Sequence, residues 1–69
     1  MKKIKIDTEY IKLDQFLKYI GVVQTGGQGK ILIEEKKVEI NGEVVTERGK
    51  KIRRGDKIKI KDVDDFVVI

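Results

Sequence analysis

The chain has 69 residues and a formal net charge of +4 at pH 7, and it contains no Cys, His, Ser, Trp or Pro. It therefore offers no disulfide, no thiolate nucleophile, no Ser-His triad and none of the usual zinc ligand sets. A chain this short is expected to form one domain over residues 1–69, burying roughly 60% of its unfolded surface. No apolar run exceeds four residues, so we expect neither a membrane span nor a signal peptide, and a cytoplasmic location.

Positive charge is concentrated in one segment of the chain. Residues 48–61 contain eight Lys or Arg and a single acid, Asp56. A dense basic stripe is typical of proteins that bind a polyanion, but it is also typical of a solvent-exposed surface whose lysines only keep the protein soluble. Charge alone therefore leaves nucleic-acid binding and a solvated surface open.

An alternating segment and a helical segment open the chain. Residues 3–6 alternate polar and apolar side chains, which indicates a half-buried strand. Residues 12–20 have helical periodicity, and Gly21 follows where a C-terminal helix glycine belongs. The face expected to be buried consists of Leu13, Phe16, Leu17 and Ile20.

A second helix is predicted to begin at Thr25 and to run to residue 35. Thr25 and Gln28 have the spacing of a capping box, in which the N-cap hydroxyl accepts a backbone N–H three residues later. Gly29, Leu32 and Ile33 would share one face of this helix. Only a short loop separates the two helices, so we expect a compact helix–loop–helix pair.

After residue 37 the apolar period changes to two. Val38–Ile40, Asn41-Gly42 and residues 43–45 form a hairpin pattern, because Asn-Gly suits the positive φ angles of a type I′ turn. The expected fold class is α+β, with the helix pair packed on one face of a small, mostly antiparallel sheet. The sequence further predicts a polar loop at residues 46–51, followed by Ile52 as a lone apolar anchor to the core. A turn is expected at residues 54–56, and strands are expected at residues 57–61 and 66–69.

The glycine cluster does not form a nucleotide-binding loop. A P-loop would need Gly in place of Gln24 and a hydroxyl residue in place of Ile31. In the first turn of a helix, however, the N–H groups of Gly26 and Gly27 lack intrahelical partners and would admit a phosphate group closely. Packing and turn geometry explain these two glycines equally well, and for Gly29 packing against the first helix is favoured.

The loop from Arg48 to Arg54 is a second candidate for phosphate contacts, with a solubilising loop as the alternative. Gly49 and Gly55 bracket it, so we expect it to be mobile. A row of outward lysines follows on a strand that we expect at the sheet edge. There a role against strand–strand aggregation is favoured over binding for Lys57, Lys59 and Lys61.

Catalysis is not expected, because no pair of acids lies in an apolar setting that would raise a pKa. No cofactor or metal is expected either. Phe16 and Phe66 belong to apolar segments, which leaves Tyr10 and Tyr19 as the candidate exposed aromatics. Any RNA would therefore be recognised by shape and phosphates rather than by stacking of a run of unpaired bases.

Four short motifs, in order and with matching spacing, resemble the S4 RNA-binding domain family. Residues 12–17 resemble its R-L-D-x-x-L opening, and Thr25–Ile33 its second helix. Residues 38–42 resemble its V-x-V-N-G hairpin, and residues 54–58 its x-G-D-x-I close. The match spans residues 11–60 and looks most like the short stand-alone bacterial S4 proteins. It implies the S4-like (αL) fold, with a helix–loop–helix face that binds structured RNA, often ribosomal RNA.

The resemblance, together with the two open glycine amides, defines the candidate RNA contacts. They lie at the start of the first helix, at the start of the second helix and in the basic loop. The residues are Lys12, Thr25, Gly26, Gly27, Gln28, Lys30, Arg48, Lys50, Lys51, Arg53 and Arg54.

Two positions depart from the family pattern. Many S4 domains have Arg after the Ser or Thr that begins the second helix, and here Gly26 stands there. Either backbone amides replace that Arg, or RNA is bound weakly. Many relatives end the second helix with Gly, and here Lys36 stands there. A left-handed Lys36 would carry a strain of about 1 kcal/mol.

The sequence thus predicts a monomeric RNA-binding module for structured RNA, above all ribosomal RNA, serving ribosome assembly or translation. The alternative is a protein–protein adaptor that docks through its apolar C-terminal strand, and phosphate contacts alone leave double-stranded DNA open. One contiguous basic face would favour RNA. An exposed apolar patch with scattered charges would favour the adaptor.

Overall fold

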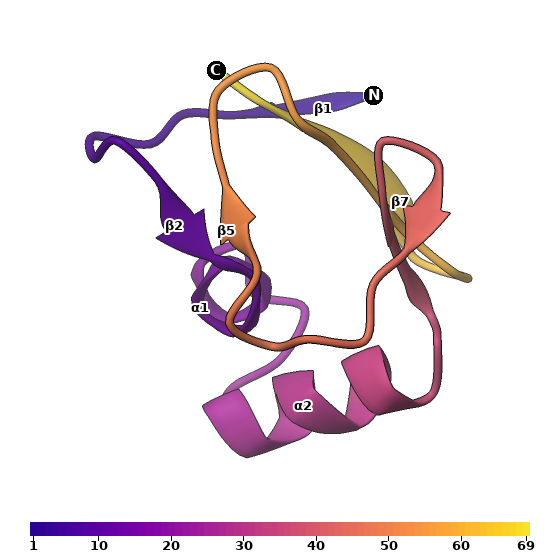
Figure 1. The fold of residues 1–69 in the computed structure, drawn as a ribbon. Coiled ribbons are helices and arrows are strands. Elements are labelled where there is room, and N and C mark those ends of the chain that lie inside the picture. Colours follow the sequence, from indigo (N-terminus) through magenta and orange to yellow (C-terminus); the bar gives the residue numbers. More distant parts are fainter.

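The computed structural model describes residues 1–69 and contains two helices and seven short strands (Figure 1). Five strands form a sheet in the order β1-β7-β6-β3-β4, and β2 and β5 form a separate ribbon. Both helices lie on one side of the sheet (Figure 1), and only the β1–β7 pair is parallel, which confirms the predicted α+β class. The elements are β1 (Lys2–Ile4), β2 (Ile11–Lys12), α1 (Leu13–Tyr19), α2 (Gly26–Glu34), β3 (Val38–Ile40), β4 (Glu43–Val44), β5 (Lys51–Ile52), β6 (Lys57–Ile60) and β7 (Asp64–Val68).

One apolar core lies between the sheet and the helices. Buried and more exposed side chains alternate along β6, where Ile58 and Ile60 point inward as predicted. Phe16 of α1 meets Phe66 of β7 edge-on, with ring centroids 6.2 Å apart. The predicted buried face of α1 is confirmed, with Ile20 only half-buried at its end. Neither helix is long and apolar enough to cross a membrane.

The two turn motifs of the C-terminal half meet in one hydrogen-bond network. Asn41 and Gly42 have φ angles of 52° and 87°, as the predicted type I′ turn requires. The Asn41 amide nitrogen donates to Asp56 Oδ1 at 3.1 Å, and Asn41 Oδ1 accepts from the Lys57 N–H at 3.0 Å. Asp56 Oδ2 accepts from the Arg53 N–H at 2.8 Å. The network fixes the end of the basic loop against the hairpin.

The expectation that residues 57–61 form an edge strand is wrong. β6 is the central strand of the sheet, because β7 folds back and pairs with the side that β3 leaves open. Strand register places Lys59 between Glu39 and Asp65 on the face of the sheet that points away from the helices. The lysines of β6 therefore do not serve to prevent another strand from pairing at a sheet edge. Lys59 has an acidic residue on each neighbouring strand.

The ends of the chain pair with each other. β1 stops at Ile4 rather than at residue 6, but the Ile69 N–H donates to the Ile4 carbonyl and the Ile6 N–H to the Ile69 carbonyl. Lys2 also forms an ion pair with Asp64, with Nζ and Oδ2 3.2 Å apart. A hydrogen bond from the Asp65 N–H, together with the Lys2 ammonium, lowers the pKa of Asp64 below its usual value. The first and last strands thus lie side by side.

Both helices end in the same Schellman motif, but with different residues at its left-handed position. After α1 the N–H groups of Gly21 and Val22 donate to the carbonyls of Lys18 and Leu17. After α2 the N–H groups of the two lysines at positions 36 and 37 donate to the carbonyls at 33 and 32. Gly21 has a φ of 81°, and Lys36 has a φ of 61°. Lys36 therefore adopts a conformation that favours glycine.

We expect Lys36→Gly to raise the free energy of unfolding by about 1 kcal/mol, because glycine has no Cβ to clash in the left-handed conformation. Thermal unfolding followed by circular dichroism measures the effect. Lys36→Ala removes the same charge but keeps the Cβ, so it should not stabilise the protein. Gly21→Ala should lower the melting temperature, because it introduces the same strain after α1. An unchanged or lower melting temperature for Lys36→Gly would contradict this account.

Candidate nucleic-acid interface

The ribbon formed by β2 and β5 brings two distant parts of the sequence together. Ile11 lies opposite Ile52, and Lys12 lies opposite Lys51, in antiparallel register. Ile52 is fully buried and Ile11 half-buried against the core, so the predicted anchor role of Ile52 is confirmed. Because side chains alternate along a strand, the other face of the ribbon points outward.

The outward face of the ribbon carries three cations and one aromatic ring. Lys12 and Lys51 face each other across it, and continuing the register by one residue places Tyr10 opposite Arg53. Lys51 Nζ lies 4.8 Å from the centre of the Tyr10 ring, and Arg53 Cζ lies 5.8 Å from it. Like charges directly opposite each other destabilise a strand pair, so this arrangement does not serve the stability of the ribbon.

The start of α1 is capped by the backbone of the basic loop. No side chain caps this helix at Lys12. Instead the Leu13 N–H donates to the Lys50 carbonyl at 2.8 Å, and the Asp14 N–H donates to the Arg48 carbonyl at 3.0 Å. These bonds satisfy two donors that a helix start leaves free. They hold Arg48 beside the first turn of α1, so the loop is more restrained than its flanking glycines predict.

The start of α2 has the predicted cap and open backbone. Thr25 Oγ1 accepts from the Gln28 N–H at 3.2 Å, while Gln28 Oε1 accepts from the Gln24 N–H, one residue before the N-cap. The N–H groups of Gly26 and Gly27 have no acceptor within the protein. A Cβ at Gly26 would meet nothing within 4 Å, and a Cβ at Gly27 would meet only Thr25 Oγ1, at 3.8 Å, so little of the protein crowds these two residues.

Gly29 packs against the first helix, as predicted from the sequence. It is buried, and a Cβ built on it would lie 3.6 Å from the Asp14 carbonyl oxygen, from Leu17 and from Val23. Asp14 therefore has the start of α2 on one side and the backbone of Arg48 on the other. The first turn of α1 is thus the point where the predicted contact regions meet.

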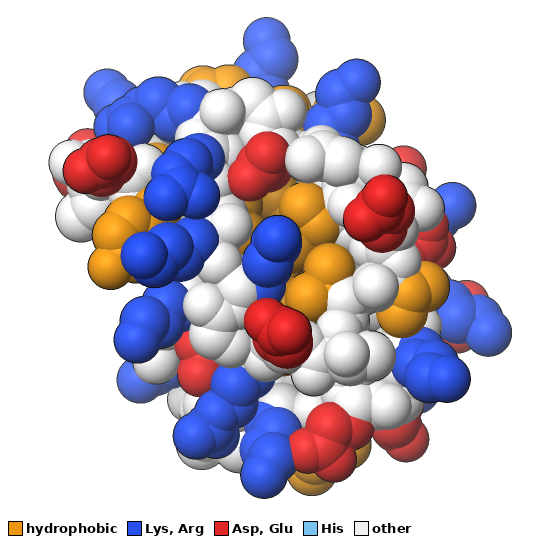
Figure 2. Space-filling model, viewed as in Figure 1, with side chains coloured by type: hydrophobic (Ala, Val, Ile, Leu, Met, Phe, Trp, Pro, Cys, Tyr) orange, Lys and Arg blue, Asp and Glu red, His pale blue; other side chains and the backbone are white.

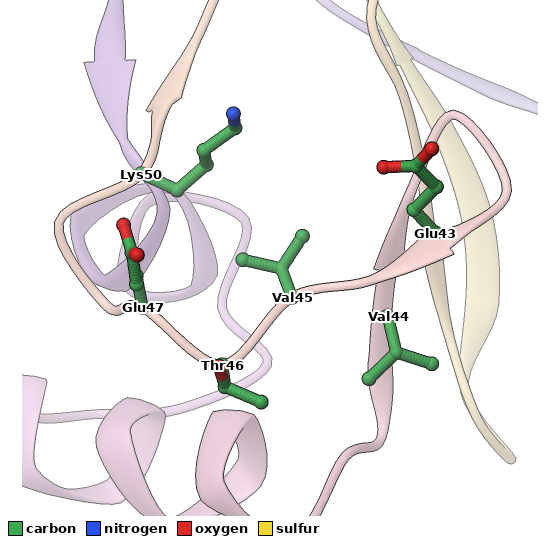
Figure 3. Close-up of a pocket in the computed structure, with 6 residues that line it drawn as sticks. All are labelled: Glu43, Val44, Val45, Thr46, Glu47 and Lys50. Atoms are coloured by element: carbon green, nitrogen blue, oxygen red, sulfur yellow. The ribbon is translucent and has the colours of Figure 1, made fainter.

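Lys50 lies apart from the other loop cations. Lys50 lies two residues before Ile52, and side chains two residues apart on a strand point to the same face. Its side chain therefore leaves the ribbon on the opposite face from Lys51. It lines a groove of about 220 Å³ together with Glu43, Val45 and Glu47. Figure 3 shows Glu47 beneath Lys50 and Glu43 on the opposite side of the groove. These two carboxylates disfavour a phosphate group there, and they mark a border of the basic surface.

Arg54 has a structural contact that the sequence did not indicate. Its Nη2 donates to the Ile6 carbonyl at 2.9 Å, in a partly buried position. This bond ties the end of the basic loop to the segment between β1 and β2. Its guanidinium is therefore less available to a ligand than that of Arg53.

Most cations of this surface have no acidic partner. The ion pairs of the protein join Lys2 to Asp64, Lys30 to Glu34, and Lys37 to Glu35. Only Lys30 among the candidate contact residues is paired, at 3.7 Å. Figure 2 shows Lys and Arg side chains gathered over the side of the molecule that carries β2 and α1. The unpaired cations of the surface are Lys12, Arg48, Lys51 and Arg53.

All four of these cations are among the contacts predicted from the sequence, but the sequence did not indicate Tyr10 as a neighbour of Lys51 and Arg53. Each strand of the ribbon has only two residues, which is too short for a periodic pattern to be recognised. The sequence offers only one signal: Tyr10 and Lys12 flank the apolar Ile11, so both would point outward if this segment were a strand. That alternation does not identify β5 as the strand with which it pairs.

Comparison with known proteins gives two matches over nearly the whole chain. Residues 4–69 match the family described as S4 domain. The chain is also 42% identical over 66 residues to the "Probable ribosome maturation protein RlbA" of Bacillus subtilis (strain 168), covering 96% of this chain and 93% of that protein. Both matches include the helix pair, the hairpin and the ribbon.

We expect Arg54→Ala to lower the free energy of unfolding by about 1 kcal/mol, because it removes a charged donor from the Ile6 carbonyl. Arg53→Ala is the matched control, and it should change stability by less than about 0.5 kcal/mol, since its guanidinium only lies near an exposed ring. Urea unfolding of both variants measures the difference. Equal losses in the two variants would assign no special role to the bond with Ile6.

Proposed function

This chain belongs to the S4 domain family, and from that membership and its unpaired cations we propose that it binds structured RNA of the ribosome or of a ribosome precursor. The observation that carries the proposal is the convergence of Lys12, Arg48, Lys51 and Arg53, which have no carboxylate partner. Phosphate groups are the ligands that offset such a concentration of positive charge. The ribosomal assignment is supported by the name of the related Bacillus subtilis protein.

In the proposed complex, residues 1–69 act as one RNA-binding domain without catalytic activity. The ribbon and Arg48 contact one run of phosphates. The open amides of Gly26 and Gly27, with Thr25, Gln28 and Lys30 beside them, contact a neighbouring phosphate at the start of α2. Such contacts position the RNA without reading its sequence. Recognition then depends on the shape of the RNA backbone.

The distribution of exposed apolar side chains does not favour the adaptor alternative. The large exposed ones belong to different helices, strands and turns and form no run in the sequence. The C-terminal strand β7, through which the adaptor was expected to dock, pairs with β1 on one side and β6 on the other and has no free edge. A docking surface for a protein partner would need a contiguous apolar patch. The large exposed apolar residues are Met1, Tyr10, Tyr19, Ile31, Val44, Val63 and Ile69.

We expect Lys51→Ala to weaken binding to structured RNA of any sequence. If about four phosphates are neutralised, the logarithm of the binding constant should fall against the logarithm of salt concentration with a slope of about −3 to −4. Lys51→Ala should reduce the magnitude of that slope by about 1. Binding titrations at several salt concentrations measure both quantities.

Lys59→Ala is the matched control for this experiment. It also removes one exposed lysine from a strand, but Lys59 lies between Glu39 and Asp65 on the far face of the sheet. Its affinity and salt slope should equal those of the unchanged protein. Equal effects of the two substitutions would contradict the proposed surface, and a loss confined to one RNA sequence would indicate base readout instead.

The ribosomal assignment is tested by sedimentation of cell lysate in gradients at low and high salt. We expect the protein to move with a ribosomal particle at low salt and to be released at high salt, because salt competes for the phosphates. Lys51→Ala should be released at a lower salt concentration than Lys59→Ala. Migration at the top of the gradient in both salts would contradict the ribosomal assignment, and titration with structured RNA would then test RNA binding by itself.

A further inference from the structure

Tyr10 is set among the cations of the ribbon in a way that the binding of phosphates does not require. The residue is 36% exposed, and the centre of its ring lies within 6 Å of Lys51 Nζ and of Arg53 Cζ. The Tyr10 hydroxyl forms no hydrogen bond within the protein, whereas the Tyr19 hydroxyl donates to the Lys5 carbonyl at 2.9 Å. A buried or structural tyrosine normally satisfies its hydroxyl. The exposed edge of Tyr10 therefore has no evident role in the fold.

Cation–π attraction does not account for this arrangement either. At exposed sites that attraction is weak. It is opposed here by repulsion between Lys12 and Lys51, which face each other across the ribbon. An aromatic ring that adjoins unpaired cations is instead typical of surfaces that bind unpaired nucleotides, where the ring stacks on a base and the cations contact the flanking phosphates.

We propose that Tyr10 stacks on a single unpaired nucleobase of the bound RNA, while Lys51 and Arg53 contact the phosphates on either side of that nucleotide. This inference rests on the proposed RNA-binding function and adds a preference to it. The protein would favour a helical RNA with an unpaired nucleotide over an uninterrupted duplex. One ring accepts one base, so the surface does not read a run of unpaired bases.

The test compares two RNAs with the same base pairs, a blunt duplex and a duplex with one bulged nucleotide. The unchanged protein should bind the bulged RNA more tightly. Tyr10→Leu should lower the affinity for the bulged RNA about tenfold and leave the affinity for the blunt duplex unchanged, because stacking on an aromatic ring is lost. Tyr10→Phe keeps an aromatic ring and should retain the preference.

Tyrosine emission gives an independent readout. The protein has no Trp and two Tyr, so Tyr19→Phe leaves Tyr10 as the single strong emitter. Its emission should be quenched by the bulged RNA and not by the blunt duplex. The matched protein, Tyr10→Phe, keeps only Tyr19 and should show no such difference.

The outcomes separate this inference from the proposed function. If Tyr10→Leu weakens both RNAs equally, or changes neither affinity, the stacking role is overturned while RNA binding through phosphates stands. If Tyr10→Phe loses the preference as fully as Tyr10→Leu, the hydroxyl rather than the ring is responsible, and the stacking role is again overturned. If the unchanged protein binds neither RNA, both proposals fail.

Discussion

Two backbone hydrogen bonds at the start of α1 determine where the basic surface forms. The carbonyls of Lys50 and Arg48 accept the N–H groups of Leu13 and Asp14, and thereby replace the side-chain cap that this helix lacks. The same bonds bring β5 alongside β2, and Asp14 in turn packs against Gly29 of α2. The helix pair and the basic loop thus share one junction.

The junction also explains why charges of one sign are tolerated beside each other. Ile52 is fully buried on the inner face of the ribbon, and burial of such a side chain contributes about 1.5–3 kcal/mol. A directly opposite pair of side chains on two strands changes stability by less, about 0.2–1 kcal/mol. The core can therefore hold Lys12 opposite Lys51 without a compensating acid. A polyanion that binds this surface removes the remaining repulsion.

Local sequence patterns predicted the parts of the fold that local physics controls. The face of α1, the Thr25 cap, the Asn41-Gly42 turn and the inward side chains of β6 follow from periodicity or from the φ angles that glycine and asparagine permit. The ribbon and the central position of β6 could not be predicted in this way, because each depends on pairing between distant segments. For the same reason the sequence grouped Lys50 and Arg54 with the other loop cations, whereas one lies in an acidic groove and the other bonds a distant carbonyl.

Gly26 stands where many S4 domains have Arg, so in this protein α2 contributes less positive charge to the interface than the ribbon does. Without a side chain there, the start of α2 offers two backbone donors and one lysine, Lys30, that already pairs with Glu34. Backbone donors attract a phosphate through a partial charge of about half a unit at the helix start, and each free lysine or arginine contributes a full charge. The ribbon presents Lys12, Lys51 and Arg53 without acidic partners. Most of the salt dependence of RNA binding should therefore come from the ribbon rather than from α2.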